Sequence, residues 1–194
     1  MAKLEETEIF YPADKAAWRE WLEQYHEEKD AVWLMCYKKA TGVPTVSWSD
    51  AVDVALCFGW IDSVRRSLDG ERYIQYYGKR KARSAWSKIN KDKVAQLTAE
   101  GQMSPAGMAS VSKAKENGSW TLLDEAEAMQ VPEELEAALR KSPDAAAYFN
   151  GLSKSVKKAI LFWLALARRA DTREKRIEII VSRAAEGKIP EQFV

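Results

Sequence analysis

The residues of this sequence whose types and spacing suit ligand chemistry gather at one end of a predicted hairpin. Asp69-Gly70 separates two extended segments, 60–68 and 71–77, and this pair is a strong hairpin signal because both positions tolerate positive φ. The start of the first strand and the residues after the second strand then lie side by side. The candidate ligand-binding residues brought together in this way are Trp60, Asp62, Arg80, Arg83, Ser84, Trp86, Ser87 and Asn90.

Most of these side chains are donors that suit an anion. The planar guanidinium groups of Arg80 and Arg83 can hold a phosphate or carboxylate through paired hydrogen bonds, and a helix beginning at Asn90 adds backbone N–H donors. A structural interpretation competes with this one: Asp62 pairs internally with an arginine, the tryptophans are core, and the serines and Asn90 satisfy turns and a cap. Loss of binding without unfolding in Arg80→Ala favours the first interpretation, whereas simple destabilisation by Trp86→Ala favours the second.

Enzymatic chemistry finds little support in the residue pattern. His26 is the single histidine and lies in a polar helical stretch, so no Ser/His/Asp or Cys/His arrangement is recognisable. Cys57 stands between Leu56 and Phe58, which favours a buried thiol over a nucleophile. Neither clustered metal ligands nor a P-loop or dinucleotide-binding glycine motif is present. We therefore expect no catalytic residue, no metal and no cofactor, and the sequence leaves open whether any catalysis occurs.

Single-stranded nucleic acid is an alternative partner, because tyrosines are interleaved with bases along residues 72–83. Strand alternation places Tyr73 and Tyr77 on one face and Tyr76 on the other, so at least one face is packed core rather than a stacking platform. The isoelectric point near 7.7 also argues against a dedicated nucleic-acid binder. The sequence favours a small anionic ligand or a protein partner over nucleic acid, and leaves the oligomeric state open.

The charges of this chain are segregated although the net charge is only +1. Residues 1–30 carry nine acids against four bases, whereas residues 63–93 carry ten bases against three acids. Residues 124–136 hold six acids and no base. Such blocks can attract charged partners, or they can pair with one another within one molecule.

The composition is that of a globular protein, with 46% hydrophobic and 30% charged residues in 194. The longest apolar runs, 31–36 and 159–167, are too short to cross a bilayer, and the acidic start has no apolar leader. We therefore expect a cytoplasmic protein with no transmembrane segment. The two cysteines, Cys36 and Cys57, sit in apolar stretches and are expected to be core thiols.

Local signals place helices around the hairpin and throughout the last third of the chain. The predicted elements are a helix capped by Asp14 and ending near Glu28, a strand over 31–37, a helix capped by Ser47 and ending at Gly59, a helix capped by Asn90, and a helix from Pro105 to Asn117. After a weakly structured acidic bridge over 121–130, helices are predicted to start at Pro132, Pro143 and Ser153, and at a capping box over 171–174.

The predicted fold class is α+β. A small antiparallel sheet with the hairpin 60–68/71–77 is packed by helices, and an all-α C-terminal helical module follows it. The expected domains are an α+β domain over 1–120 and a helical module over 131–190. An apolar stripe along 156–167 can build a separate small bundle or pack on the first domain, so independent folding of the tail is left open.

An ordered set of short motifs resembles the YdeI/OmpD-associated, or bacteriocin-protection, family over nearly the whole chain. The motifs are ALCFGWIDS at 55–63, SAWSKINK at 84–91, GQMSPAG at 101–107, AKENGSW at 114–120 and ADTREKRI at 170–177. Several converge on the hairpin end that carries the candidate site. The sequence departs from the family at Gly78-Lys79-Arg80, where relatives usually read Thr-Pro-Arg.

The resemblance implies an α+β N-terminal part and a helical C-terminal part, which agrees with the residue pattern. It also implies a role in envelope or antimicrobial-peptide stress tolerance, and no established reaction. We therefore expect a non-enzymatic binding or interaction protein. The alternatives are a small-anion-binding domain or enzyme with its site at the hairpin and the 79–90 loop, and a single-stranded nucleic-acid binder.

Overall fold

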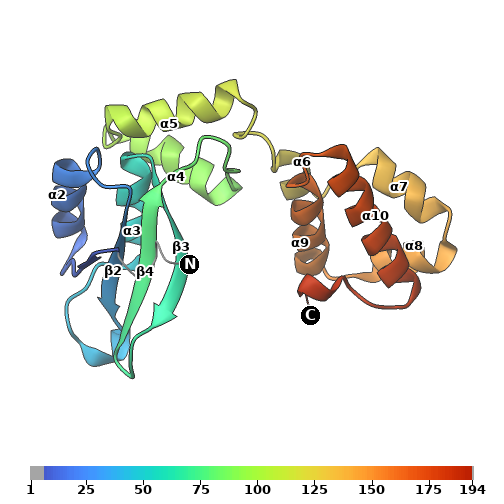
Figure 1. The fold of residues 1–194 in the computed structure, drawn as a ribbon, viewed down its shortest axis with the longest axis horizontal. Helices are drawn as coiled ribbons and strands as arrows, with labels where there is room; N and C mark the ends of the chain where they lie inside the picture. Colours follow the sequence, from blue (N-terminus) through green and yellow to red (C-terminus); the bar gives the residue numbers. More distant parts are fainter. Residues whose placement is uncertain (1–6, 194) are drawn as a thin grey trace. The chain divides into compact units, whose positions relative to one another are not determined.

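The computed structural model describes residues 7–193, and they form two compact units (Figure 1). The N-terminal unit contains residues 7–84 and Ile89–Ser119, and the C-terminal unit contains Ala85–Lys88 and residues 120–193. The chain therefore enters the C-terminal unit for four residues, returns, and enters it again after Ser119. The chain forms one sheet packed with helices and then helices alone, which confirms the predicted α+β class.

The N-terminal unit is built on one four-stranded sheet with the order β1-β2-β4-β3. The two strands nearest the centre, β2 and β4, are antiparallel, and β3 pairs antiparallel with β4 to make the predicted hairpin. The short β1 pairs parallel to β2 and was not predicted, since two residues carry no periodicity. The strands are β1 (Ile9–Phe10), β2 (Ala31–Tyr37), β3 (Trp60–Ser67) and β4 (Arg72–Lys79).

The hairpin turn is closed by Asp69. Its Oδ1 accepts hydrogen bonds from the backbone N–H groups of Glu71 (2.8 Å) and Arg72 (2.7 Å), and its Oδ2 accepts one from Arg72 Nε (2.8 Å). The Arg72 guanidinium is the largest influence on this carboxyl group and, with the two N–H donors, lowers the pKa of Asp69 to about 2. A register shift between Asp62 and Arg65 marks an irregularity in β3.

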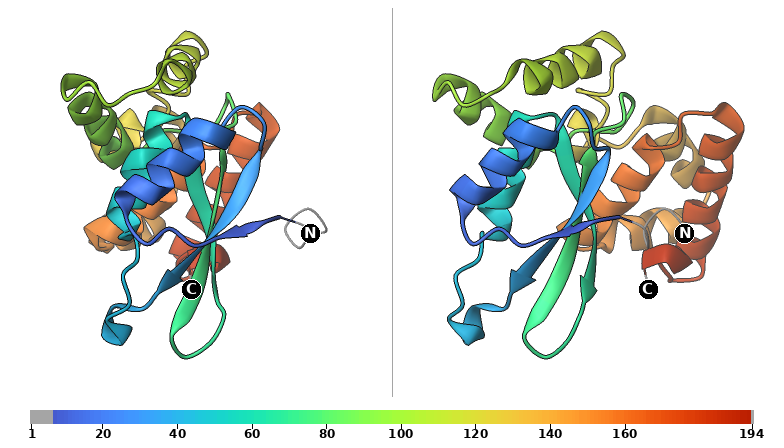
Figure 2. Two further views of the ribbon diagram at one scale, coloured as in Figure 1. Left: turned by 90° about the vertical axis from the view of Figure 1, so that its left-hand side faces the viewer. Right: turned by 60° about the vertical axis from the view of Figure 1, so that its left-hand side comes forward.

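Two helices cover the same face of this sheet, as both views of Figure 2 show. They are α2 (Lys15–Tyr25) and α3 (Trp48–Cys57), and both begin at the predicted caps. Asp14 accepts from the N–H of Ala17, and Ser47 accepts from the N–H of Asp50. Between helices and sheet, Trp18 is fully buried, with its ring 5.5 Å from that of Tyr77.

Two further helices, α4 (Lys88–Ala99) and α5 (Pro105–Glu116), lie beyond the end of the sheet where β3 begins and β4 ends (Figure 1). Helix α5 begins at Ser104, whose Oγ accepts from the N–H of Gly107. The prediction that Asn90 caps α4 is wrong. The helix begins two residues earlier, at Lys88, so Asn90 lies in its first turn.

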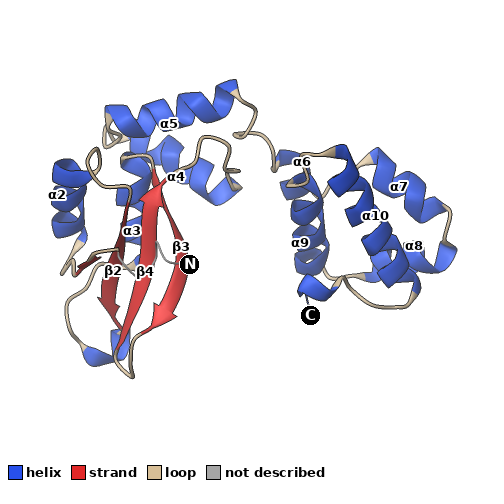
Figure 3. Ribbon diagram, viewed as in Figure 1, coloured by secondary structure: helices blue, strands red, loops and turns tan. Residues whose placement is uncertain are grey.

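The C-terminal unit is all helical (Figure 3). Its core is apolar and includes Leu135, Phe149, Ile160, Leu164 and Ile180. The helices are α6 (Asp124–Glu127), α7 (Glu133–Arg140), α8 (Pro143–Gly151), α9 (Lys154–Ala165) and α10 (Ala170–Ala185).

Two local predictions in the C-terminal unit are corrected by the structure. The acidic bridge over 121–130 contains the short helix α6, whose Ala126 is buried. Helix α10 starts at Ala170, so Asp171 lies in the first turn rather than at the cap. In the first turn its negative charge still interacts favourably with the positive end of the helix dipole. Among residues 7–193, no helix is long and apolar enough to cross a membrane.

Candidate functional site

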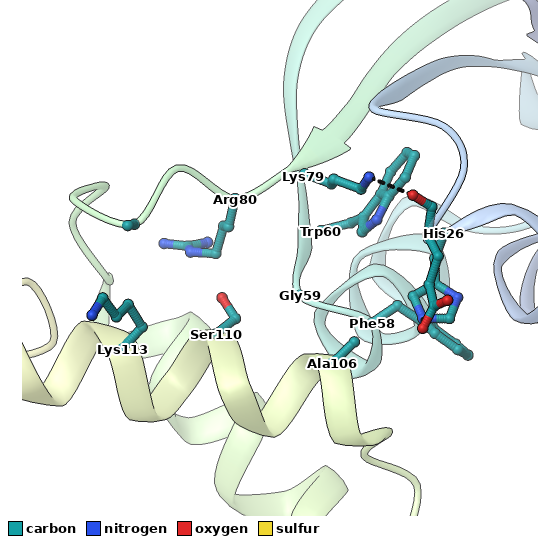
Figure 4. Close-up of a pocket in the computed structure, with 11 residues that line it drawn as sticks. His26, Phe58, Gly59, Trp60, Lys79, Arg80, Ala106, Ser110 and Lys113 are labelled. Carbon is teal, nitrogen blue, oxygen red and sulfur yellow. Dashed lines mark hydrogen bonds and ion pairs between the residues drawn. The ribbon is translucent and has the colours of Figure 1, made fainter.

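A pocket of about 410 Å³ lies in the N-terminal unit where α2 ends, β3 begins, β4 ends and α5 passes (Figure 4). This volume falls within the range of small-molecule sites. We call it the anion pocket. Its lining residues are His26, Glu27, Phe58, Gly59, Trp60, Lys79, Arg80, Ala82, Ala106, Ser110 and Lys113.

The hairpin supplies the residues on two sides of the pocket. Trp60 at the start of β3 pairs with Lys79 at the end of β4, and the N–H of Arg80 donates to the carbonyl of Gly59 (2.9 Å). The two ends of the hairpin therefore lie side by side, as its turn signal predicted. Gly59 follows α3 with φ +73°, a left-handed conformation that allows the chain to turn directly from helix into strand.

Helix α5 reaches the pocket because two glycines allow it to press against the end of α3. A Cβ atom on Gly107 would lie 2.2 Å from the carbonyl oxygen of Cys57, and one on Gly59 would lie 3.1 Å from Cβ of Ser110. The hydroxyl of Ser104 also donates to the Cys57 carbonyl (2.7 Å). This close approach brings Ser110 and Lys113 to the pocket wall.

The pocket is rich in positive charge. Lys79 and Arg80 lie at the end of β4 and Lys113 lies in α5, and Glu27 is the one acid among the lining residues described. Lys79 donates to the carbonyl of Glu27 (2.9 Å) and to Asp30 (3.1 Å), so part of its charge is already balanced. In Figure 4 the side chain of Arg80 extends over the space that Ser110 and Lys113 border from below.

Arg80 is the most deeply placed of the three bases. Burial lowers the pKa of its guanidinium to about 10, against the opposing field of Asp62. At neutral pH the group is still charged. A buried charge of this kind is stabilised by an anion placed next to it, since attraction between charges is stronger where water is excluded.

Two polar rings complete the wall. Trp60 is fully buried, and within the described part of the chain its indole Nε1 has no hydrogen-bond acceptor. An acceptor reaches this donor only if neighbouring side chains shift, because the nitrogen itself is not exposed. His26 donates from Nδ1 to the carbonyl of Leu22 (2.8 Å).

The structure brings two of the predicted site residues, Trp60 and Arg80, to the anion pocket. Asp62 does not line it; its Oδ2 accepts hydrogen bonds from Trp48 Nε1 (2.9 Å) and Gln75 Nε2 (3.4 Å). Ser84 closes a turn by donating to the carbonyl of Lys81 (2.6 Å).

The other predicted residues lie elsewhere. Arg83 is exposed in the loop after β4, and Asn90 is in α4. Trp86 and Ser87 belong to the C-terminal unit, where Trp86 is buried with its ring 5.0 Å from that of Trp120.

Several lining residues were missed by sequence reasoning. Lys79 could have been found, because the hairpin register places it directly opposite Trp60. His26, Ser110 and Lys113 gave no such signal, since their positions at the pocket depend on how α2 and α5 pack on the end of α3.

The donors exposed in this pocket suit an anion. They are ammonium, guanidinium and hydroxyl groups, which match a carboxylate or phosphate. Across residues 7–193, no group of three or more histidine, cysteine, aspartate or glutamate side chains is arranged to hold a metal ion. Cys36 and Cys57 are both free and buried, and burial raises the pKa of each thiol.

Fold and site together define a two-unit protein, with a basic ligand pocket in an α+β unit and a helical unit after it. Residues 10–110 match a family described as a domain of unknown function (DUF8412), and this match spans more than half of the chain. The chain belongs to this family. Residues 128–187 match the family described as Bacteriocin-protection, YdeI or OmpD-Associated (OmdA), which confirms the predicted resemblance in the C-terminal unit. No curated protein and no solved structure matches the chain.

Proposed function

We propose that this protein is a binding protein whose N-terminal unit holds a small organic anion in the anion pocket. The observation that carries the proposal is the convergence of Lys79 and Arg80 at the end of β4 with Lys113 of α5 on one pocket of about 410 Å³. Scattered surface bases are ordinary, but bases gathered around a concave site raise the local concentration of anions. The pocket thus supports a ligand carrying a carboxylate or phosphate group.

The apolar part of the wall indicates that the ligand is more than a bare ion. Ala82, Ala106 and the ring of Phe58 line the same space as the bases. Small-molecule sites typically combine such apolar surface with a few placed polar groups that fix orientation. An organic anion with a small apolar body fits this combination better than inorganic phosphate does.

The biological setting is part of the same proposal. The match of the C-terminal unit to a family described by bacteriocin protection supports a role in envelope or antimicrobial-peptide stress tolerance. We place this role in the cytoplasm, and assign the protein to binding rather than catalysis.

The proposal is tested by screening the purified full-length protein for thermal stabilisation by phosphate, mono- and dicarboxylates and nucleotides. A ligand present at about 100 times its Kd stabilises the folded state by about 2.7 kcal/mol, a shift that is easily measured. Hits are then titrated by calorimetry. We expect Arg80→Ala to weaken binding at least tenfold.

Arg83→Ala is the matched control, because it removes the same charge from the same loop at a residue that does not line the pocket. It should bind like the unmodified protein. Equal losses in Arg80→Ala and Arg83→Ala would show that only general basicity is involved. An absence of stabilisation by every anion would overturn the proposal and favour a macromolecular partner.

A further inference from the structure

A second hollow, of about 580 Å³, lies in the N-terminal unit between β1 and α2. We call it the aromatic groove. Its lining comes from the extended segment that carries β1 and from one side of α2, where Ala17, Trp21 and Gln24 recur at helical spacing. The lining residues are Glu8, Phe10, Tyr11, Ala13, Ala17, Glu20, Trp21, Gln24 and Tyr25.

Aromatic rings in mutual contact form the base of this groove. Trp21 stacks on Phe10 with ring centroids 5.7 Å apart, and Tyr25 lies 5.3 Å from Trp21. Tyr11 is exposed at the edge, held by its ring contact with Tyr37 and by a hydrogen bond from its hydroxyl to the carbonyl of Pro44. The rings are thus fixed before any partner binds, which reduces the entropy lost on binding.

The charge of the aromatic groove is opposite to that of the anion pocket. Among its described lining residues, Glu8 and Glu20 are charged and no base is present. Glu20 is exposed and forms no ion pair within residues 7–193. Two acids of the block, Glu8 and Glu20, therefore lie at a site with aromatic walls.

The chain itself shows that this surface accepts a cation. The ammonium group of Lys29 lies 4.8 Å from the ring centroid of Tyr25 and 5.5 Å from that of Trp21, and it pairs with Glu8. Aromatic faces attract ammonium and guanidinium groups in this geometry. Tyr11 and Glu20 offer the same two features on the part of the groove that Lys29 does not occupy.

The shape of the site favours an extended ligand. β1 is the first strand in the sheet order, so among residues 7–193 one of its edges has no neighbouring strand, and Phe10 of β1 lines the groove. Such an edge can pair with an added strand through backbone hydrogen bonds. Alternate side chains of that strand would point toward the rings and acids of the groove.

We propose that the aromatic groove docks an extended segment of a partner protein that carries lysine or arginine side chains alternating with apolar ones. The cationic groups lie against Tyr11 and Glu20, which Lys29 does not occupy, and the apolar side chains fill the space beside Phe10. This interaction is separate from anion binding, because the two sites differ in charge and share no lining residue.

The test uses the full-length protein and a fluorescent ten-residue peptide of alternating lysine and valine, titrated by anisotropy near physiological salt. A peptide of alternating glutamate and valine serves as the control ligand. We expect saturable binding of the lysine peptide only. Glu20→Lys and Tyr11→Ala should each weaken it at least tenfold.

Two control variants make the result specific. Glu178→Lys makes the same charge change on the exposed face of α10, and Arg80→Ala alters the anion pocket; both should leave peptide binding unchanged. Equal weakening by Glu20→Lys and Glu178→Lys would overturn the proposal in favour of general charge attraction. An absence of lysine-peptide binding would also overturn the proposal. Self-association of the protein that Glu20→Lys abolishes would overturn it as well, because it would assign the groove to a second copy of the chain.

Discussion

Glu127 illustrates how one carboxylate can hold distant segments of the C-terminal unit together. Its Oε1 accepts from the backbone N–H of Lys88 at the start of α4 (3.1 Å), and its Oε2 pairs with the ammonium of Lys158 in α9. Burial by itself raises the pKa of Glu127, but the bonds from Lys158 and Lys88 outweigh it and leave the pKa below its usual value.

This lowered pKa predicts a pH-dependent contribution to stability. A carboxyl group whose pKa is lower in the folded state stabilises that state above its unfolded pKa, near 4.5, and loses this effect as the pH falls through the lower folded value. Glu127→Gln should lower the free energy of unfolding by about 1–2 kcal/mol at pH 7. Urea unfolding at pH 7 and pH 3 measures the difference, which should be smaller at the lower pH.

Glu136→Gln is the comparison variant, because Glu136 forms only an exposed ion pair with Arg140 on α7. Exposed pairs contribute little, so its effect should be within about 0.5 kcal/mol at either pH. A difference between Glu127→Gln and the unmodified protein that is the same at both pH values would contradict the assigned role of the charge.

At the scale of elements, the position of α5 depends on the absence of a side chain at Gly107. We predict that Gly107→Ala destabilises the protein by about 1–3 kcal/mol or more, because the added methyl group would meet the backbone of Cys57 and force α5 away from α3. The same displacement would move Ser110 and Lys113, so any anion identified by screening should bind less tightly. Chemical unfolding and ligand titration measure the two effects.

Gly151→Ala provides the control for this change. Gly151 ends α8, has ordinary φ, and an added Cβ would meet nothing within 4 Å. Alanine there should be neutral or stabilise by about 0.4–1 kcal/mol through the unfolded chain. Equal stability of Gly107→Ala and Gly151→Ala would show that α5 adapts without cost.

At the scale of the whole molecule, the chain crosses between its two units more often than a simple series of domains would require. Residues Ala85–Lys88, between β4 and the body of α4, belong to the C-terminal unit, and Trp86 is buried there against Trp120. A fragment that starts after Ser119 would therefore lack a large apolar side chain of its own compact unit.

Trp86→Ala should accordingly destabilise the C-terminal unit by about 3–5 kcal/mol, the usual range for deleting a buried tryptophan. Calorimetry of the full chain can identify the transition by its response to Phe149→Ala, which removes a core residue of this unit. Trp48→Ala is the control, because its ring is 53% exposed, and it should cost far less. If Trp86→Ala lowers the unfolding temperature of the C-terminal unit no more than Trp48→Ala does, residues Ala85–Lys88 contribute little to the stability of that unit.

The elements of this protein were largely determined by local sequence. Asp14, Ser47 and Ser104 cap helices through bonds to N–H groups three residues ahead, and the Asp69-Gly70 turn sets the hairpin register. Such signals act over a few residues, so they can be recognised without knowledge of the fold. They also sufficed to place Trp60 next to the residues after β4.

Only the tertiary structure decided which side chains line the anion pocket and the aromatic groove. Lys113 lines the same pocket as Arg80 because the backbones of α3 and α5 approach closely at Gly107. Glu8 lines the same groove as α2 because β1 adds to the sheet beside β2. Packing between elements far apart in the sequence depends on close contact and buried area across the whole core, which no local pattern records. The acidic and basic blocks were visible in the sequence, but their separation into a basic pocket and an acidic, aromatic groove arises from that packing.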